Sequence, residues 1–332
     1  MEYLWLIGGF VLLIVGADIF VEGSSAIAKL FKIPAIIIGL TVVAFGTSMP
    51  EASVSISAAL AGSNDIAVSN VVGSNIFNML VVLGASALIL PVRSNETAVK
   101  KEIPFSIIVA AVLGGILCFG MKFAEAAIPE SGLFAKLSGA TFTLGRIGGV
   151  ILLALFALYM YWQIAGALKA RKSGEAEELE DGKKVSPFMA VEMVILGIVG
   201  IILGGNLVVD NATIIAENFG MSQNFIGLTI VAVGTSLPEL VTSIVAAKKG
   251  ESDLALGNVI GSNIFNIIFI LGFSSIVAPM TVDILSIYDI IVLIGISILG
   301  WIFAKTKHKV SRGEGAIMLG MYVVYFVYIL LR

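Results

Sequence analysis

Long apolar runs separated by short charged segments dominate this sequence of 332 residues. A bilayer core roughly 30 Å thick needs about 20 apolar residues per helix, and only helices or closed barrels satisfy their backbone hydrogen bonds inside it. The runs therefore predict an all-α polytopic membrane protein with ten transmembrane helices. We expect the spans at residues 3–28, 34–60, 67–90, 103–120, 144–168, 188–216, 223–247, 254–278, 288–304 and 314–331.

The composition excludes several classes of function. Charged residues make up 13% of the chain, against about 25% in soluble domains, and a net charge of −3 argues against a nucleic-acid partner. A single cysteine, Cys118, cannot form an intramolecular disulfide, and the single histidine, His308, makes histidine-based catalysis unexpected. No phosphate-binding GxxxxGK[ST] loop is present, so we expect neither a nucleotide partner nor an enzyme.

The basic residues fall mainly on one side of the predicted membrane. If the ten predicted spans cross the membrane in turn, 16 of the 20 lysines and arginines lie on one side and 4 on the other. Because cytoplasmic loops carry the excess of basic residues, we expect both termini outside and the charged loops inside. We expect the polar segment 169–187 to be a cytoplasmic linker, with a regulatory role as the alternative. We also expect the first run to be a membrane span and not a signal peptide, because it has no basic residue before Lys29.

An internal repeat organises the chain into two halves. Residues 16–91 align without gaps onto residues 204–279, with 35 identities over 76 positions. We expect a first half, 1–168, and a second half, 188–332, of five spans each. Because five is odd, the second half enters the membrane from the opposite side, which makes the halves inverted repeats. Such repeats are typical of transporters that bind substrate near the midplane, although channels can have them too.

Two glutamates, Glu51 and Glu239, occupy equivalent positions inside apolar spans two and seven. A carboxylate in the bilayer is costly and marks a functional site by default, with a structural carboxyl at a helix contact as the plain alternative. Each follows a proline, Pro50 or Pro238, which opens the helix and frees a backbone carbonyl. Recurrence of the whole pattern in both repeats favours a functional site.

Hydroxyl and amide side chains accompany these carboxylates in both repeats. Some of them could serve only packing and interhelical hydrogen bonds. Together they supply hard oxygen ligands, which suit Na⁺, Ca²⁺ or Mg²⁺ rather than soft transition metals, and Ca²⁺ fits this supply best. The candidate side-chain ligands are Glu51, Glu239, Thr47, Ser48, Thr235, Ser236, Ser74, Ser262, Asn78 and Asn266.

Further polar residues lie near the ends of spans one and six. Asp18 and Glu22 are four residues apart, and Asn206 and Asp210 match them in the second repeat. They either line an ion pathway or sit at a hydrated helix end, and the sequence does not separate these interpretations.

The motifs GTSMPE, GTSLPE and the two GSNIFN segments strongly resemble the alpha-repeats of the sodium/calcium exchangers of the calcium:cation antiporter superfamily. The repeat resemblance covers 152 of the 332 residues directly. It implies that Glu51 and Glu239 bind a central Ca²⁺. It also implies that the remaining candidate ligands, with the backbones of Ala44 and Ala232, bind Na⁺ or Ca²⁺, and that spans one and six slide across the bundle.

The function implied by this resemblance is a secondary antiporter that exchanges Na⁺ for Ca²⁺ by alternating access. We expect no prosthetic group, Na⁺ and Ca²⁺ as transported ions, a monomer in the lipid bilayer, and a location in a prokaryotic plasma (inner) membrane. The nearest alternative is a Ca²⁺/H⁺ exchanger, and a channel belongs to a different class.

Some relatives have Asp where this chain has Asn266, notably the potassium-dependent branch, so K⁺ co-transport is less favoured. The net charge of a site with two carboxylates is zero when one Ca²⁺ is bound and +1 when three Na⁺ are bound.

Overall fold

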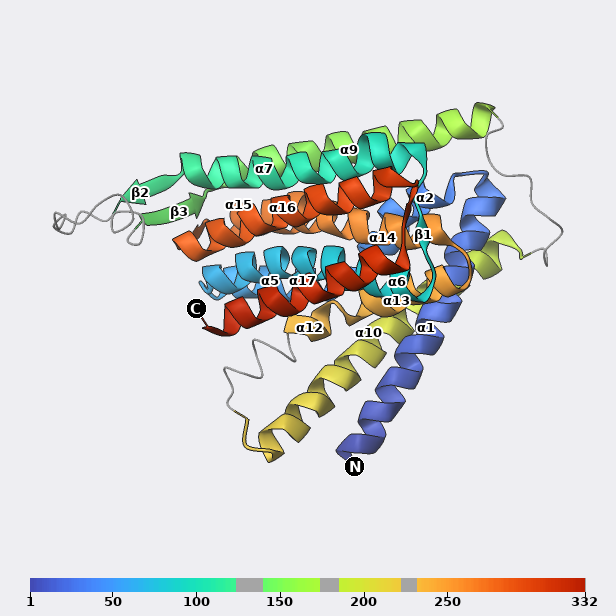
Figure 1. Ribbon diagram of the computed structural model, residues 1–332, viewed down its shortest axis with the longest axis horizontal. Coiled ribbons are helices and arrows are strands. Elements are labelled where there is room, and N and C mark those ends of the chain that lie inside the picture. Colours follow the sequence, from blue (N-terminus) through green and yellow to red (C-terminus); the bar gives the residue numbers. More distant parts are fainter. Residues whose placement is uncertain (124–139, 174–184, 222–231, 332) are drawn as a thin grey trace.

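The computed structural model describes residues 1–123, 140–173, 185–221 and 232–331 as one elongated bundle of helices (Figure 1). Within these residues, eight helices are long and apolar enough to cross a membrane, and a bent pair makes up to nine. The polytopic helical fold predicted from the sequence is therefore confirmed. The predicted span 223–247 lies partly outside the described residues, and its described part forms α12 and α13.

The helices and strands of the first half keep the order expected from the apolar runs. They are α1 (Glu2–Phe31), α2 (Ala35–Ile38), η1 (Gly39–Val43), α3 (Ala44–Thr47), α4 (Met49–Leu60), α5 (Asn64–Phe77), η2 (Asn78–Val82), α6 (Leu83–Ile89), β1 (Val92–Arg93), η3 (Ala98–Glu102), α7 (Ile103–Phe119), β2 (Met121–Phe123), β3 (Ala140–Leu144) and α9 (Arg146–Ser173).

The second half repeats much of this order. Its elements are α10 (Pro187–Asn218), α12 (Ala232–Thr235), α13 (Leu237–Lys248), α14 (Ser252–Phe265), η5 (Asn266–Leu271), α15 (Gly272–Val277), β4 (Met280–Val282), α16 (Ile284–Thr306), β5 (Lys309–Val310) and α17 (Arg312–Leu331).

Two long spans change helical register at the same repeat position. The span from α5 to α6 passes through the π-helical turn η2, which begins at Asn78, and the span from α14 to α15 passes through η5, which begins at Asn266. Turns of this kind are rare and often lie at functional sites. The last asparagine of each GSNIFN motif therefore stands where its span departs from regular α-helix.

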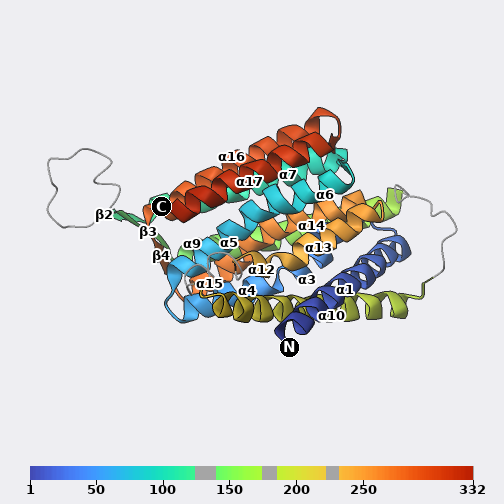
Figure 2. The same ribbon diagram turned by 60° about the horizontal axis from the view of Figure 1, so that its bottom comes forward.

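The core of the bundle surrounds α14 and its continuation. In the apolar window of the span Ser252–Val277, 94% of the residues are buried, against 17% in that of Arg312–Leu331. Figure 2 shows α13, α14 and α5 in the middle of the molecule, with α16 and α17 along one side and α1 and α10 along the other. Exposed apolar side chains such as Leu4, Ile195 and Val324 cover the outer helices, which suits a surface that faces lipid.

Helices α1 and α10 pack against each other through glycines. A Cβ atom at Gly16 would lie 2.7 Å from the backbone nitrogen of Ile201, and one at Gly204 would lie 2.5 Å from the backbone nitrogen of Leu13. Only glycine allows two helix backbones to approach this closely. The two helices run side by side along one face of the bundle (Figures 1 and 2).

Short strands lie between the ends of several helices, and the apolar runs did not predict them. β1 pairs with β5, and β2, β3 and β4 form a three-stranded sheet. β4 precedes α16 and β5 follows it, so the two sheets lie at opposite ends of a helix about 35 Å long. The span predicted at 103–120 begins earlier than expected, at Ala98. The helical turn Ala98–Glu102, which contains Lys100 and Lys101, precedes the apolar run, so hydropathy did not include it.

Candidate cation-binding site

Both repeats break their second helix within the GTS-x-PE motif. In the first repeat α3 ends at Thr47 and α4 begins at Met49, with a bend of 51° between the two helical segments. Ser48, at the break, has φ −82° and ψ 8°, and Pro50 occupies the first turn of α4. The predicted opening of the helix at the motif is confirmed, and it places Glu51 in the positively polarised first turn of a new helix.

The second repeat has the same break at Ser236. This residue has φ −92° and ψ 6°, between α12 and α13, and Pro238 follows it in the first turn of α13. Glu239 therefore stands in the same local position as Glu51. Side chains of both glutamates are fully buried.

Each glutamate accepts a hydrogen bond from a serine of the other repeat. The Ser48 hydroxyl donates to Glu239 Oε1 over 2.9 Å, and the Ser236 hydroxyl donates to Glu51 Oε1 over 3.0 Å. A second serine from the same repeat lies further away: Ser74 Oγ is 3.5 Å from Glu51 Oε1. Its counterpart Ser262 Oγ is 3.4 Å from Glu239 Oε1.

The other oxygen of each carboxylate has no hydrogen-bond donor among the residues that the structure describes. Glu51 Oε2 and Glu239 Oε2 are buried there, and neither carboxylate makes a salt bridge to a described residue. A buried carboxylate that lacks a compensating charge is strongly unfavourable. The geometry therefore calls for a cation, or a proton, at this position.

A reciprocal network of asparagines joins the two GSNIFN motifs. Asn75 Nδ2 donates to the backbone oxygen of Asn263 over 3.0 Å, and Asn263 Nδ2 donates to that of Asn75 over 3.3 Å. Asn78 Nδ2 in turn donates to Asn263 Oδ1 over 3.2 Å, and Asn266 Nδ2 donates to Asn75 Oδ1 over 3.0 Å. Asn78 Oδ1 and Asn266 Oδ1 remain buried without a donor.

A second pair of asparagines supports the helices that carry the glutamates. Asn70 Nδ2 donates to Ser55 Oγ over 2.9 Å and lies 3.4 Å from the backbone oxygen of Glu51. The same contacts recur with the same distances at Asn258, Ser243 and Glu239.

Sequence reasoning missed six residues of this network. Each of them is identical at the matching position of the other repeat, and that identity is the signal that could have found them. They are Asn70, Asn75, Asn258, Asn263, Ser55 and Ser243.

The remaining predicted ligands lie in the same region with differing roles. Thr47 Oγ1 is 3.0 Å from Asn258 Oδ1 and 3.2 Å from the backbone oxygen of Val43. The backbone oxygen of Ala44 already accepts from the Ser48 amide over 3.1 Å. Thr235 is buried and ends α12, and Ala232 begins that helix.

Four buried oxygens without donors thus belong to the predicted site: two from carboxylates and two from amides. Oxygens of these kinds are the usual ligands of Ca²⁺ and other hard cations. Among the described residues no group of three or more His, Cys, Asp or Glu is placed to hold a metal ion. The two carboxylates at this site can offset the charge of one divalent cation.

Asp18 and Glu22 take part in a different contact. The Lys249 ammonium lies 2.8 Å from Asp18 Oδ1 and 3.8 Å from Glu22 Oε2, which links α1 to the residue after α13. Both acidic side chains are more than half exposed, and their repeat counterparts Asn206 and Asp210 are exposed as well. These contacts favour the hydrated helix end over the ion pathway.

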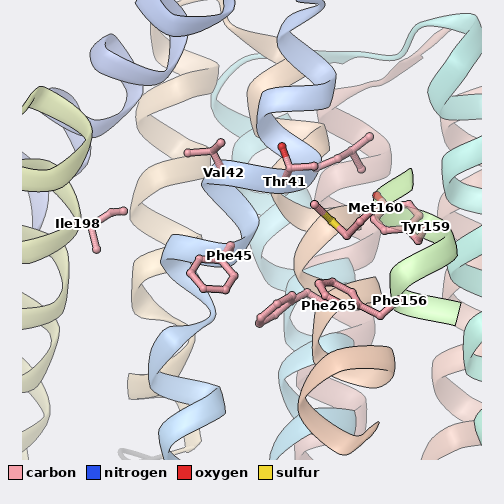
Figure 3. Close-up of a pocket in the computed structure, with 9 residues that line it drawn as sticks. Thr41, Val42, Phe45, Phe156, Tyr159, Met160, Ile198 and Phe265 are labelled. Atoms are coloured by element: carbon pink, nitrogen blue, oxygen red, sulfur yellow. The ribbon is translucent and has the colours of Figure 1, made fainter. Parts of the chain in front are cut away.

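An apolar cavity of about 290 Å³ lies beside the break of the first repeat. Figure 3 shows Phe45, Phe156 and Phe265 around it, with Ile198 on the far side. Its polar lining side chains are Thr41, whose hydroxyl donates to the backbone oxygen of Ile37, and Tyr159. None of the predicted ligands lines this cavity, so it is separate from the cation-binding site.

The duplicated motifs thus place buried oxygens without hydrogen-bond donors inside a helical membrane bundle, which defines a membrane protein suited to binding hard cations. The sequence pattern of the sodium/calcium exchanger protein family matches residues 1–165 and 189–331. The chain belongs to this family.

Full-length relatives occur in bacteria and archaea. The chain is 35% identical to the inner membrane protein YrbG of Escherichia coli, covering 96% of this chain and 94% of that protein. It is 34% identical to the sodium/calcium exchanger MaX1 of Methanosarcina acetivorans, covering 98% of both. A solved structure of the sodium-calcium exchanger NCX_Mj, soaked with Na⁺ and Sr²⁺, superposes with a TM-score of 0.81 at 32% identity over 98% of this chain and 97% of that one.

Proposed function

We propose that this protein exchanges Na⁺ for Ca²⁺ across the membrane. The observation that carries the proposal is the set of four buried oxygens without hydrogen-bond donors, contributed by Glu51, Glu239, Asn78 and Asn266. Membership of the sodium/calcium exchanger family supports the identity of both ions. The two carboxylates offset the two charges of one Ca²⁺, whereas the neutral oxygens suit the weaker demands of Na⁺.

In this proposal Glu51 and Glu239 bind the Ca²⁺ through their free Oε2 atoms. Ser48 and Ser236 hold the opposite Oε1 atoms by the hydrogen bonds of 2.9 and 3.0 Å, which fixes the direction of each carboxylate. The other predicted ligands bind Na⁺ or Ca²⁺, depending on which ions occupy the site. They are Thr47, Thr235, Ser74, Ser262, Asn78, Asn266 and the backbones of Ala44 and Ala232.

The proposed architecture is ten spans in two inverted halves, 1–168 and 188–332, joined by the segment 169–187. The reciprocal bonds between Asn75 and Asn263 support a two-fold relation, because each residue makes to the other the contact that it receives. A cation bound on the two-fold axis would contact equivalent ligands from both halves.

The proposed orientation places both termini outside in a prokaryotic plasma membrane, with the protein acting as a monomer. The excess of basic residues predicted for the cytoplasmic side supports it, since residues such as Lys249, Lys305 and Arg312 lie near helix ends. Bacterial and archaeal relatives support the membrane assignment.

Exchange of two ions through one site requires alternating access, and we assign the moving part to α1 and α10. Their glycine contacts join them to each other, and they lie along one face of the bundle (Figure 2). The buried breaks at Ser48 and Ser236 would remain with the bundle and keep the ligands in place.

The test is ⁴⁵Ca²⁺ uptake into proteoliposomes that contain the purified protein. We expect uptake when Na⁺ is inside and absent outside, and none when choline replaces Na⁺. The double variant Glu51→Gln/Glu239→Gln is the control for leakage. Uptake that persists without any counter-ion gradient would identify a channel and reject the exchange.

Two further gradients separate the alternative exchangers. A pH gradient at zero Na⁺ that drives Ca²⁺ uptake would identify a Ca²⁺/H⁺ exchanger. A requirement for K⁺ on the Na⁺ side would identify the potassium-dependent mode. We expect no K⁺ requirement, because the described site has amides at both asparagine positions, and we expect Na⁺ as the counter-ion because the chain belongs to the sodium/calcium exchanger family.

A further inference from the structure

The short sheet formed by β1 and β5 places two cationic side chains opposite each other. The strands are antiparallel, and their register pairs Arg93 directly with Lys309. Like charges that face each other across an antiparallel pair are destabilising. Both side chains are exposed, and in the part of the chain that the structure describes neither makes a salt bridge.

Other basic residues surround this pair. Lys305 and Lys307 end α16, and Arg312 begins α17, where it donates to the backbone oxygen of Ile89 over 3.1 Å. We call Arg93, Lys305, Lys307, Lys309 and Arg312 the basic ribbon.

The acidic groups near the basic ribbon are already engaged. Glu96 contacts Lys100 and lies 3.8 Å from His308 Nε2, and the hydrogen bond from Lys100 lowers the pKa of Glu96 below its usual value. Glu314 accepts from the amide and the hydroxyl of Ser311 over 2.7 and 2.6 Å. In the described part of the chain, none of the five residues of the basic ribbon makes a salt bridge, and their positive charges outnumber these two carboxylates.

The basic ribbon lies at the level where a bilayer interface is expected. It connects the end of α16 to the start of α17, two helices that can cross a membrane. The Lys305 ammonium lies 5.0 Å from the ring centre of Trp301, an aromatic residue of the kind that marks membrane interfaces. Exposed apolar side chains, including Leu88 and Ile302, cover the adjoining helix turns.

A groove of about 560 Å³ runs between α16 and α17 below the basic ribbon. It begins at Ile317, five residues after Arg312, and extends to Tyr328, a length of about 16 Å along α17. Its lining is almost entirely apolar, and Ile317 and Val324 are 54% and 71% exposed. This length is about half of the roughly 30 Å bilayer core, the depth of one leaflet.

We propose that the basic ribbon and the groove between α16 and α17 together bind one anionic phospholipid. The phosphate lies between Arg93 and Lys309 and relieves their repulsion, and an acyl chain lies in the groove. A general excess of basic residues on one side of the membrane accounts for neither the direct pairing of two cations nor the apolar groove that starts five residues after Arg312.

The test measures lipid binding and needs no transport assay. Purified full-length protein, stripped of lipid in detergent, is titrated with phosphatidylglycerol or phosphatidylcholine while native mass spectrometry counts bound lipids and thermal unfolding is followed. We expect one phosphatidylglycerol to remain bound and to raise Tm, whereas phosphatidylcholine does neither.

Two variants address the two parts of the site. A basic residue near an anionic membrane surface contributes roughly a fivefold preference, so Arg93→Gln/Lys309→Gln should weaken phosphatidylglycerol binding about 25-fold. Lys169→Gln/Lys172→Gln, which removes the same charge from the exposed end of α9, should leave it unchanged. Gly320 lines the groove and has open space around its Cβ position, so Gly320→Phe should fill the groove without a clash and also weaken binding.

Three results would overturn the proposal. Equal loss in the two double variants would mean a non-specific charge effect. A Tm increase with inorganic phosphate equal to that with phosphatidylglycerol, unaffected by Gly320→Phe, would assign the basic ribbon to a soluble anion. A dimer that Gly320→Phe dissociates, with the lipid count unchanged, would assign the groove to a second copy of the chain. If Arg93→Gln/Lys309→Gln does not fold, Lys309→Gln alone and Gly320→Phe decide the outcome.

Discussion

The Ser48 hydroxyl donates to Glu239 Oε1 over 2.9 Å, although the two residues are 191 positions apart in the sequence. The mirror contact joins Ser236 to Glu51 over 3.0 Å. Each repeat therefore orients the carboxylate of the other, and neither half completes a carboxylate site by itself.

The crossed serines should contribute equally to ion binding. Ser48→Ala and Ser236→Ala each remove a hydrogen bond to a charged group, which typically contributes ~1.5–3 kcal/mol. We expect the Ca²⁺ concentration for half-maximal ⁴⁵Ca²⁺ uptake to rise about tenfold or more in either variant. Ser57→Ala, at an exposed position of α4, is the matched control. A loss confined to one of the two serine variants would contradict the equivalence of the repeats.

Removal of either carboxylate charge should abolish Ca²⁺ transport. Glu51→Gln and Glu239→Gln keep the side-chain shape but remove a charged ligand from a fully buried position, and an uncompensated buried ion typically costs several kcal/mol. We expect less than a few per cent of wild-type Na⁺-dependent uptake in each variant. Glu192→Gln, which changes an exposed glutamate of α10, should transport normally. Substantial exchange by either site variant would reject the carboxylates as Ca²⁺ ligands.

Ca²⁺ should stabilise the folded protein through the four free oxygens. A ligand that binds only the folded state at 100 times its Kd contributes about 2.7 kcal/mol. Thermal unfolding followed by tryptophan fluorescence should therefore show a Tm that rises with Ca²⁺ in the wild type. The increase should vanish in Glu51→Gln/Glu239→Gln. An unchanged Tm in the wild type would mean that these oxygens do not bind the ion.

The candidate site was partly predictable because carboxylates inside apolar runs stand out. Glu51 and Glu239 are visible in the sequence without any structure, and the prolines beside them predict the helix breaks. The asparagine network was not predictable from local patterns, since Asn75 meets Asn263 only when distant segments of the chain come together. Likewise, the apolar pattern does not reveal that the Ala44 carbonyl accepts from the Ser48 amide.

The fold was predictable to the extent that hydropathy governs it. Spans such as α1 and α16 coincide with their apolar runs within a few residues. The paired strands escaped prediction because pieces such as Val92–Arg93 are too short to show a periodic pattern. The π-helical turns at Asn78 and Asn266 also leave no mark on hydropathy, since an inserted residue changes the register but not the composition.

A carboxylate at position 266 should change the ion requirement. Asn266 Nδ2 donates to Asn75 Oδ1 over 3.0 Å, and Asn266→Asp replaces this donor by an acceptor. The added charge and the lost donor both favour uptake of an extra monovalent cation or a proton. Flux at constant Na⁺ should then depend on K⁺ or on pH, whereas the wild type depends on neither near neutrality. Identical behaviour of variant and wild type would place position 266 outside the ion cluster.

The orientation can be tested with one introduced thiol. Ser173 ends α9, on the proposed cytoplasmic side, and the chain has a single native cysteine, Cys118. In a Cys118→Ser background, Ser173→Cys should react with a membrane-impermeant maleimide only in inside-out vesicles. The Cys118→Ser protein without the added thiol is the blank. Labelling of right-side-out cells would reverse the proposed topology.

The backbone contact between α1 and α10 has a mechanical consequence. Because a Cβ at Gly16 would meet the backbone of α10 at 2.7 Å, no side chain lies between the two backbones at this contact to absorb a relative displacement. In the proposed exchange cycle, a shift of α1 would therefore carry α10 with it, and the two helices would share one degree of freedom. Such a coupling would prevent both entrances from opening at once, so that ions would not run down their gradients through a continuous pore.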